Sequence, residues 1–113
     1  MHTLDYNKLH SFTTKFANDI FVRFSVLDTP VRCGSISFHT RNENGDFSMP
    51  LQCPKDIQVR NMRNGVVVSF GWDKDKCIIN PKEDYEIIYN GFTIMKIMGK
   101  CEHCIEAVAD LVT

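Results

Sequence analysis

Several features that would place this chain in a specialised class are absent from its 113 residues. No apolar run approaches the roughly 18 residues of a membrane-spanning helix, and the first residues lack the basic and apolar regions of a signal peptide. We therefore expect no membrane partner and a cytoplasmic location. Neither sign of charge dominates, because 13 lysines and arginines face 14 aspartates and glutamates, for a net charge of −1. Composition alone therefore predicts no long-range attraction to nucleic acid.

Alanine is scarce, with only three residues, whereas isoleucine, asparagine and lysine, whose codons are AT-rich, are abundant. This bias is typical of AT-rich genomes, such as those of low-GC bacteria and bacteriophages. In size and composition the chain is similar to the small accessory proteins of bacteriophages, which act in the host cytoplasm.

The cysteines do not form the even framework of a small secreted scaffold, because there are five of them at irregular spacing. They are Cys33, Cys53, Cys77, Cys101 and Cys104. We expect reduced thiols, as in a cytosol.

Two segments have the apolar spacing of amphipathic helices. Leu9, Phe12 and Phe16 recur at intervals of three and four residues, which predicts a helix from about residue 4 to about residue 19. Near the other end, Ile105 and Val108 lie on one face of a second predicted helix, from residue 101 to residue 113.

Most of the remaining chain alternates with the period of β-strands. Residues 20–26 and 31–40 read as strands, and Asn44-Gly45 predicts a hairpin that pairs 31–40 with 47–51. A second hairpin is predicted around Asn64-Gly65, and residues 77–79 read as a short strand. The clearest signal is Asn90-Gly91 between two apolar runs, which predicts a type I′ turn.

These elements together predict an α+β fold in a single domain spanning residues 1–113. It would hold an N-terminal helix, a mostly antiparallel sheet of about six or seven strands in hairpins, and a short C-terminal helix. A composition of 43% hydrophobic and 24% charged residues is that of an ordinary globular chain, so a packed core is expected.

The segment Cys101-Glu102-His103-Cys104 is the one cluster that suggests metal or thiol chemistry. Two thiols at this spacing can chelate a zinc ion, but zinc requires two further ligands, from Cys33, Cys53, Cys77 or a histidine. A single pair without a second one is a weak signal, and packing of both thiols in the core is the simpler interpretation.

The order of elements around this pair, Gly99-Lys100 and then the two cysteines before a helix, resembles the active-site corner of thioredoxin-like oxidoreductases. The resemblance implies that Cys101 is the nucleophile and Cys104 the resolving thiol. It covers about twenty residues, and that fold continues with further strands and helices where this chain has nine residues left.

One predicted hairpin combines cations with aromatic residues. Arg60 and Arg63 are candidate partner-binding residues, and Phe70 and Trp72 could stack on nucleic-acid bases. Alternation places both aromatic residues on the expected core face, which favours packing.

The glycines occur singly in predicted turns and form no phosphate-binding loop. No histidine belongs to a catalytic motif. The leading hypothesis is therefore a non-enzymatic protein-binding module without a cofactor, a bacteriophage accessory factor that inhibits or redirects a host enzyme. Two alternatives are a zinc-binding or thiol-redox module using Cys101 and Cys104, and a nucleic-acid or nucleotide-ligand binding protein. Pairing of sheet edges or faces also predicts a homodimer.

Overall fold

The computed structural model describes residues 2–8, 10–17, 20–27, 33–40, 57–70, 76–101 and 104–109, and every helix or strand within them is a β-strand. The strands are β1 (His2–Asp5), β2 (Ser11–Ala17), β3 (Ile20–Leu27), β4 (Cys33–Thr40), β5 (Ile57–Asn61), β6 (Val67–Ser69), β7 (Lys76–Ile79), β8 (Tyr85–Tyr89), β9 (Phe92–Cys101) and β10 (Cys104–Ala109). The α+β fold expected from the sequence is therefore wrong, and the described residues form an all-β structure.

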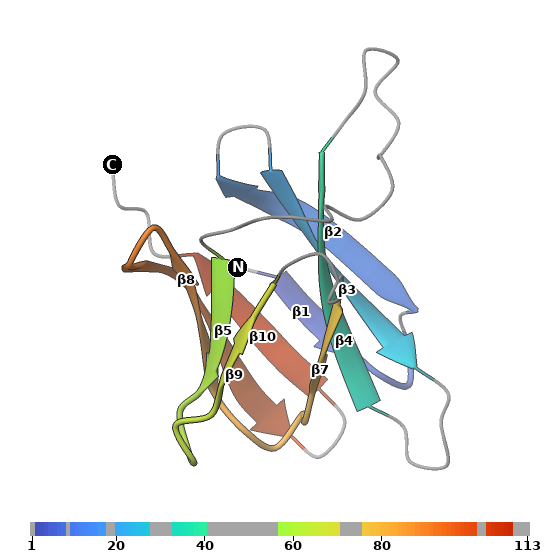
Figure 1. Cartoon of the computed structure of the whole chain (residues 1–113). Coiled ribbons are helices and arrows are strands. Elements are labelled where there is room, and N and C mark those ends of the chain that lie inside the picture. Colours follow the sequence, from blue (N-terminus) through green and yellow to red (C-terminus); the bar gives the residue numbers. More distant parts are fainter. Residues whose placement is uncertain are drawn as a thin grey trace.

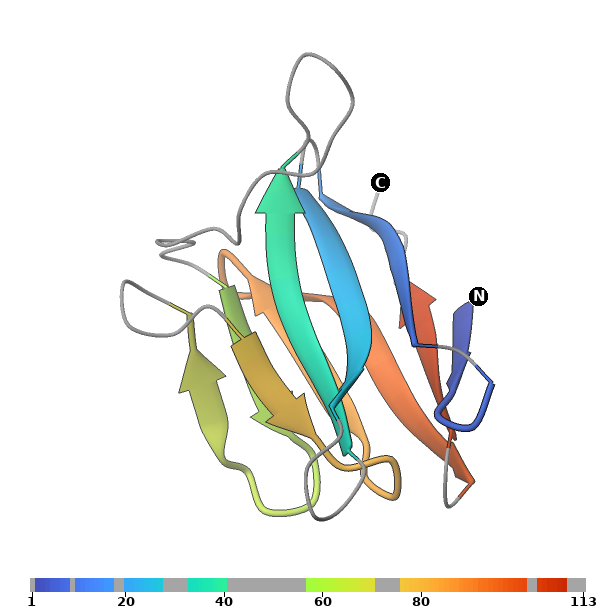
Figure 2. The same ribbon diagram turned by 90° about the vertical axis from the view of Figure 1, so that its right-hand side faces the viewer.

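The strands form two antiparallel sheets that face one another (Figure 1). One has six strands in the order β1-β10-β9-β8-β5-β6, and the other has four in the order β2-β3-β4-β7. The chain passes between the sheets after β1, β4, β6 and β7. Figure 2 shows β2, β3 and β4 as the layer in front of β8, β9 and β10.

The core lies between the two sheets and takes alternate residues from each strand. Val22 and Phe24 of β3 face Ile87 of β8 and Ile97 of β9 across this layer, all of them fully buried. Alternation then directs the intervening residues of each strand to the two outer faces. Those outer faces carry the charged residues of the strands.

Aromatic rings join the two sheets. Phe16 of β2 stacks on Tyr89 of β8, with ring centroids 5.7 Å apart, and also meets the edge of Phe38 at 5.0 Å. Phe38 of β4 contacts Phe70, which follows β6, at 4.8 Å. Phe70 is buried, which confirms its predicted place in the core, whereas Trp72 lies outside the described residues.

The predicted N-terminal helix is replaced by β1, a turn and β2. Phe12 and Phe16 are four residues apart, and this even spacing puts them on one face of a strand as readily as on one face of a helix. The segment from Ser11 to Phe16 is rich in threonine and phenylalanine, which favour strands, and it forms β2. Asp5 does not begin a helix: its Oδ1 accepts a hydrogen bond from the Asn7 amide at 2.9 Å, in a tight turn.

The predicted C-terminal helix is also wrong, because residues Cys104–Ala109 form β10. This strand lies between β1 and β9 and pairs with both. Ile105 and Ala107 face the core, whereas Glu106 and Val108 face outward and are half-buried. Hydrogen bonds to two neighbouring strands outweigh a helical pattern that is too short to be stable alone.

Several predicted strands are confirmed. The hairpin of β8 and β9 turns through Asn90 and Gly91, whose φ angles of 51° and 83° fit a type I′ turn. The strands around Asn64-Gly65 pair as β5 and β6, and residues 76–79 form β7. The segment 47–51 lies outside the described residues, and β4 pairs with β3 and β7.

Tyr6 fills the space where β1 turns toward β2. Its side chain is fully buried, and among the described residues its hydroxyl has no hydrogen-bond partner. Burial raises the pKa of this hydroxyl well above its usual range. The hydroxyl lies against Gly34 of β4, where a Cβ atom would collide with it and would come within 2.9 Å of the ring carbon that bears it. Only glycine fits there.

We expect Gly34→Ala to lower the free energy of unfolding by about 1–3 kcal/mol, because the new methyl group overpacks the core. Tyr6→Phe should be neutral or stabilising by about 1 kcal/mol, because it removes a buried hydroxyl without a partner. In the Tyr6→Phe background Gly34→Ala should cost less. Urea unfolding of the four proteins measures this coupling, and additive effects would show that the hydroxyl is not the obstacle.

Candidate functional site

The outer face of the six-stranded sheet brings charged residues from three strands into one row. Arg60 of β5 lies opposite Glu86 of β8, and Glu86 lies opposite Lys96 of β9. Arg60 Nη1 and Glu86 Oε1 are 3.4 Å apart, and Glu86 Oε2 accepts a hydrogen bond from the Thr93 hydroxyl at 3.0 Å. The Glu86 carboxylate is therefore held on both of its oxygens.

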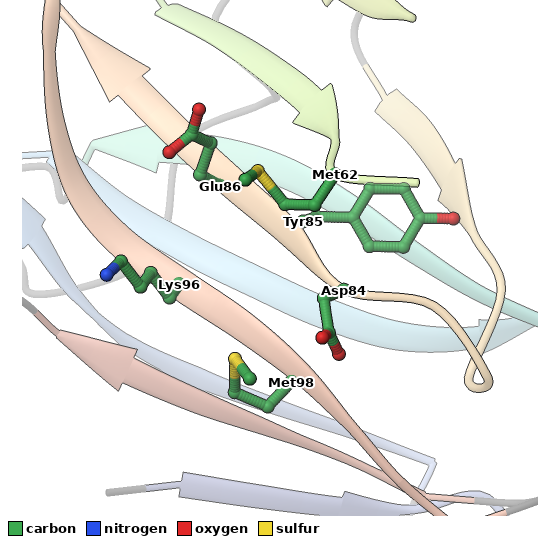
Figure 3. Close-up of a pocket in the computed structure, with 6 residues that line it drawn as sticks. All are labelled: Met62, Asp84, Tyr85, Glu86, Lys96 and Met98. Carbon is green, nitrogen blue, oxygen red and sulfur yellow. The ribbon is translucent and has the colours of Figure 1, made fainter. Parts of the chain in front are cut away.

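A hollow of about 230 Å³ lies beside this row, above the start of β8. It is lined by Met62, Asp84, Tyr85, Glu86, Lys96 and Met98 (Figure 3). Met62 follows β5, and its backbone amide donates to the Asp84 carbonyl at 2.9 Å. Met98 belongs to β9, so the two methionines come from the elements at either side of β8, the turn after β5 and the strand β9.

Two opposite charges at the hollow have no ion-pair partner among the residues that the structure describes. Asp84 Oδ1 accepts a hydrogen bond from the Gly99 amide at 2.8 Å, which fixes the carboxylate but does not neutralise it. Lys96 is exposed and pairs with neither Glu86 nor Asp84. The hollow is therefore apolar between its methionines. Its rim carries Asp84 and Lys96, which form no ion pair with a described residue, beside the Glu86 carboxylate that is paired with Arg60 (Figure 3).

Exposed apolar side chains gather on the same sheet. Of the six large apolar residues that are exposed among those described, five belong to the six-stranded sheet and its turns. These five are Met62, Val66, Val67, Phe92 and Met98. Met62 is 48% exposed and Met98 37%, so both thioethers that flank the hollow are accessible to a partner.

The edge of this sheet at β6 is a second accessible feature. The Val66 carbonyl and the Phe70 amide bond to β5, at 2.9 and 3.1 Å. Because backbone groups alternate in direction along an antiparallel strand, the amide and carbonyl groups of Val67 and Ser69 point away from β5. β6 is thus a short strand with four backbone groups directed outward.

The two arginines predicted to bind a partner each form an ion pair with an acidic side chain. Arg60 contacts Glu86, and Arg63 Nη1 lies 3.3 Å from Glu83 Oε1. Arg63 belongs to the turn between β5 and β6, and its pair links this turn to the loop before β8. The structure brings Arg60 to the row beside the hollow but leaves Arg63 out of it.

Glu83 is the centre of this linkage. Its carboxylate also accepts hydrogen bonds from the Asn61 amide at 2.8 Å and from the Tyr85 hydroxyl at 3.3 Å. The bond from Asn61, with those from Arg63 and Tyr85, holds the pKa of Glu83 below its usual range, against the smaller opposing effect of desolvation. This network fixes the loop that leads into the hollow.

Cys101 and Cys104 lie at the turn between β9 and β10, where they are register partners. Cys104 is disulfide-bonded, whereas Cys33 and Cys77 are free thiols. The expectation of reduced thiols thus does not hold for Cys104. A sulfur in a disulfide is not a thiolate ligand, so the zinc interpretation of this pair stays a prediction that requires prior reduction.

Among the described residues, we find no group of three or more histidine, cysteine or acidic side chains that could hold a metal ion. Nor does any helix long and apolar enough to cross a membrane occur in that part of the chain.

Sequence reasoning missed Met62, Asp84, Lys96 and Met98. Alternation along β9 places Lys96 and Met98 on one face, so the sequence contains a signal for these two residues. It contains none for the position of Met62 near Met98, because that position depends on β5 pairing with β8 across a separation of more than twenty residues.

We expect Glu83→Gln to destabilise the fold at neutral pH but not in acid. A carboxyl whose pKa is lower in the folded chain stabilises it above the pKa of unfolded glutamate, about 4.3, and this contribution is lost as the pH falls through the folded pKa. The melting temperatures of variant and wild type should therefore approach one another as the pH falls below the pKa of unfolded glutamate and through the lower folded pKa. A difference that persists in acid would contradict this.

The state of Cys104 is open to a direct test by alkylation of the denatured protein. Without reductant, we expect Cys33 and Cys77 to be modified and Cys104 to be protected. After reduction all three should be modified, as peptide mass spectrometry would show. Modification of Cys104 in the unreduced sample would contradict the disulfide and would leave its thiol available for a metal ion.

Comparison with protein-family models, with curated proteins and with solved structures finds no match to this chain.

Proposed function

We propose that the chain is a non-enzymatic protein-binding module that docks its partner on the outer face of the six-stranded sheet. The observation that carries this proposal is the apolar hollow between Met62 and Met98, with accessible thioethers on both sides. Methionine adapts its shape to a partner side chain and is enriched at protein interfaces.

The size of the hollow fits a side chain of a partner better than a free small molecule. Pockets for small ligands usually measure about 300–1,000 Å³, and this one is smaller, at about 230 Å³. A single large apolar side chain, inserted as an anchor, would fill it. Such anchors supply much of the binding energy in protein interfaces.

The rim charges define the chemistry of the partner more closely. Asp84 would pair with a lysine or arginine, and Lys96 with an aspartate or glutamate, on opposite sides of the anchor (Figure 3). The occupant is therefore a segment of another protein in which a large apolar residue is flanked by one basic and one acidic residue. Opposite charges of this kind fix the orientation of a bound segment more than its affinity.

This proposal keeps the leading hypothesis drawn from the sequence, in which the chain inhibits or redirects an enzyme of its host. Covering the surface of that enzyme would need no catalytic group in this chain. A homodimer is the alternative occupant of the face, and β6 is where a second copy would add a strand.

The test uses peptides that share the predicted pattern, an anchor of leucine, methionine, phenylalanine or tryptophan between a basic and an acidic residue. A displayed library of this pattern is selected on the wild-type chain and counter-selected on Met62→Lys. We expect enriched peptides to shift the methyl NMR signals of Met62 and Met98 and to bind at least tenfold more weakly to Met62→Lys.

Ile78→Lys is the matched control, because Ile78 is 62% exposed on the outer face of the other sheet. It should bind the peptides as the wild type does. Failure to enrich peptides, or binding that Met62→Lys leaves intact, would overturn the proposal. So would a wild type that sediments as a dimer while Met62→Lys is a monomer, because a second copy would then cover the face.

A further inference from the structure

The four-stranded sheet differs from its partner in having no acidic residue in any of its strands. It carries three cationic side chains, which are Lys15 of β2, Arg23 of β3 and Lys76 of β7. All three are exposed. The near-zero net charge of the chain therefore hides a face with a single sign of charge.

The strand register gathers these cations on the outer face. Ser37 of β4 lies opposite Arg23 on one side and opposite Lys76 on the other. Directly opposed residues have Cβ atoms about 5 Å apart, so the Ser37 hydroxyl lies between the two cations. Lys15 lies opposite Phe21 in the adjacent row.

The three cations are not neutralised by neighbours. The ion pairs Arg60–Glu86, Arg63–Glu83 and Lys100–Glu106 all belong to the six-stranded sheet and its turns. Lys15, Arg23 and Lys76 form no ion pair with any other residue that the structure describes. Cations held near one another without counter-charges repel, and an anionic ligand would relieve that repulsion.

Hydroxyl groups lie in the same row as two of the cations, because Thr13 and Ser37 lie opposite Arg23 on its two sides. Ser11 and Ser25 form the neighbouring row, in which Ser35 is buried. The Ser37 hydroxyl is 2.8 Å from His39 Nε2, which holds it in the row between Arg23 and Lys76. Serine and threonine hydroxyls donate to phosphate oxygens as readily as cationic side chains pair with them.

We propose that this face binds the phosphodiester backbone of single-stranded nucleic acid. The cations extend from β2 to β7, about 14 Å at the usual strand spacing, which suits an extended chain of phosphates better than one phosphate group. A four-stranded sheet of this width does not enter the major groove of a duplex, which is about 12 Å wide. Sheet faces do bind single strands, through cations that follow the backbone.

The composition of the face argues against an acidic protein as its partner. Protein interfaces have an apolar centre and are depleted in lysine. Two of the three cations described on this face are lysines. Ile78 is the one large apolar side chain that is exposed among the residues described there. The two faces of the molecule are thus suited to different partners, and this inference stands independently of the proposed protein-binding face.

The test is fluorescence anisotropy of a short fluorescein-labelled oligothymidylate, titrated with the protein as KCl rises from about 20 to about 150 mM. Each phosphate contact on a single strand contributes about −0.7 to the slope of log K against log salt, so three contacts should give about −2. Arg23→Ala and Lys76→Ala should each weaken binding several-fold and reduce the slope by about 0.7.

The matched control is Arg60→Ala, which removes an exposed arginine from the opposite face and should leave both affinity and slope unchanged. Absence of binding at the lowest salt, or equal weakening by Arg60→Ala, would overturn the proposal. So would displacement of the oligonucleotide by poly-glutamate of equal charge, or by inorganic phosphate beyond the effect of its ionic strength. Those results would indicate an acidic protein or a discrete phosphate as the ligand.

Discussion

The apolar layer between the two sheets is the constraint on which the other features depend. Ring contacts between Phe16 and Tyr89 and between Phe38 and Phe70 bridge the layers, and the strands contribute alternate residues to the same core. Burial of these side chains is the main favourable term in folding. Because the inward positions are committed to packing, all chemistry that meets solvent is left to the alternate positions of each strand. The molecule therefore has two outer faces whose composition can differ freely.

The two faces use that freedom in opposite ways. The six-stranded sheet mixes acids with bases and pairs them across strands, as in Arg60–Glu86 and Lys100–Glu106, and it exposes methionine and valine. The four-stranded sheet exposes cations and hydroxyls without acids. A net charge of −1 is compatible with this segregation, because the net charge does not depend on where the charged residues lie on the surface. The expectation drawn from that sum concerns long-range attraction by the whole molecule and does not describe an individual face.

Local signals in the sequence predicted the hairpin of β8 and β9 correctly, because a type I′ turn needs two adjacent residues that tolerate positive φ, and Asn90-Gly91 supplies them. The N-terminal helix was predicted wrongly because Phe12 and Phe16 satisfy both a helical and a strand period, and only pairing with β3 separates the two. The candidate sites were beyond such signals. Arg23, Ser37 and Lys76 are neighbours only through the register of three strands, and Met62 and Met98 only through β8 between them.

The hollow on the six-stranded sheet combines a rigid floor with adaptable walls. Asp84 is held by the Gly99 amide, and the loop before it is held by Glu83, which accepts hydrogen bonds from Asn61 and Tyr85. The floor is thus formed before a partner arrives, so little ordering entropy is lost there on binding. Met62 and Met98 keep flexible side chains that can fit anchors of different shape. Such a site would discriminate among partners mainly through Asp84, because this carboxylate is held in place by the Gly99 amide while the apolar contact is permissive.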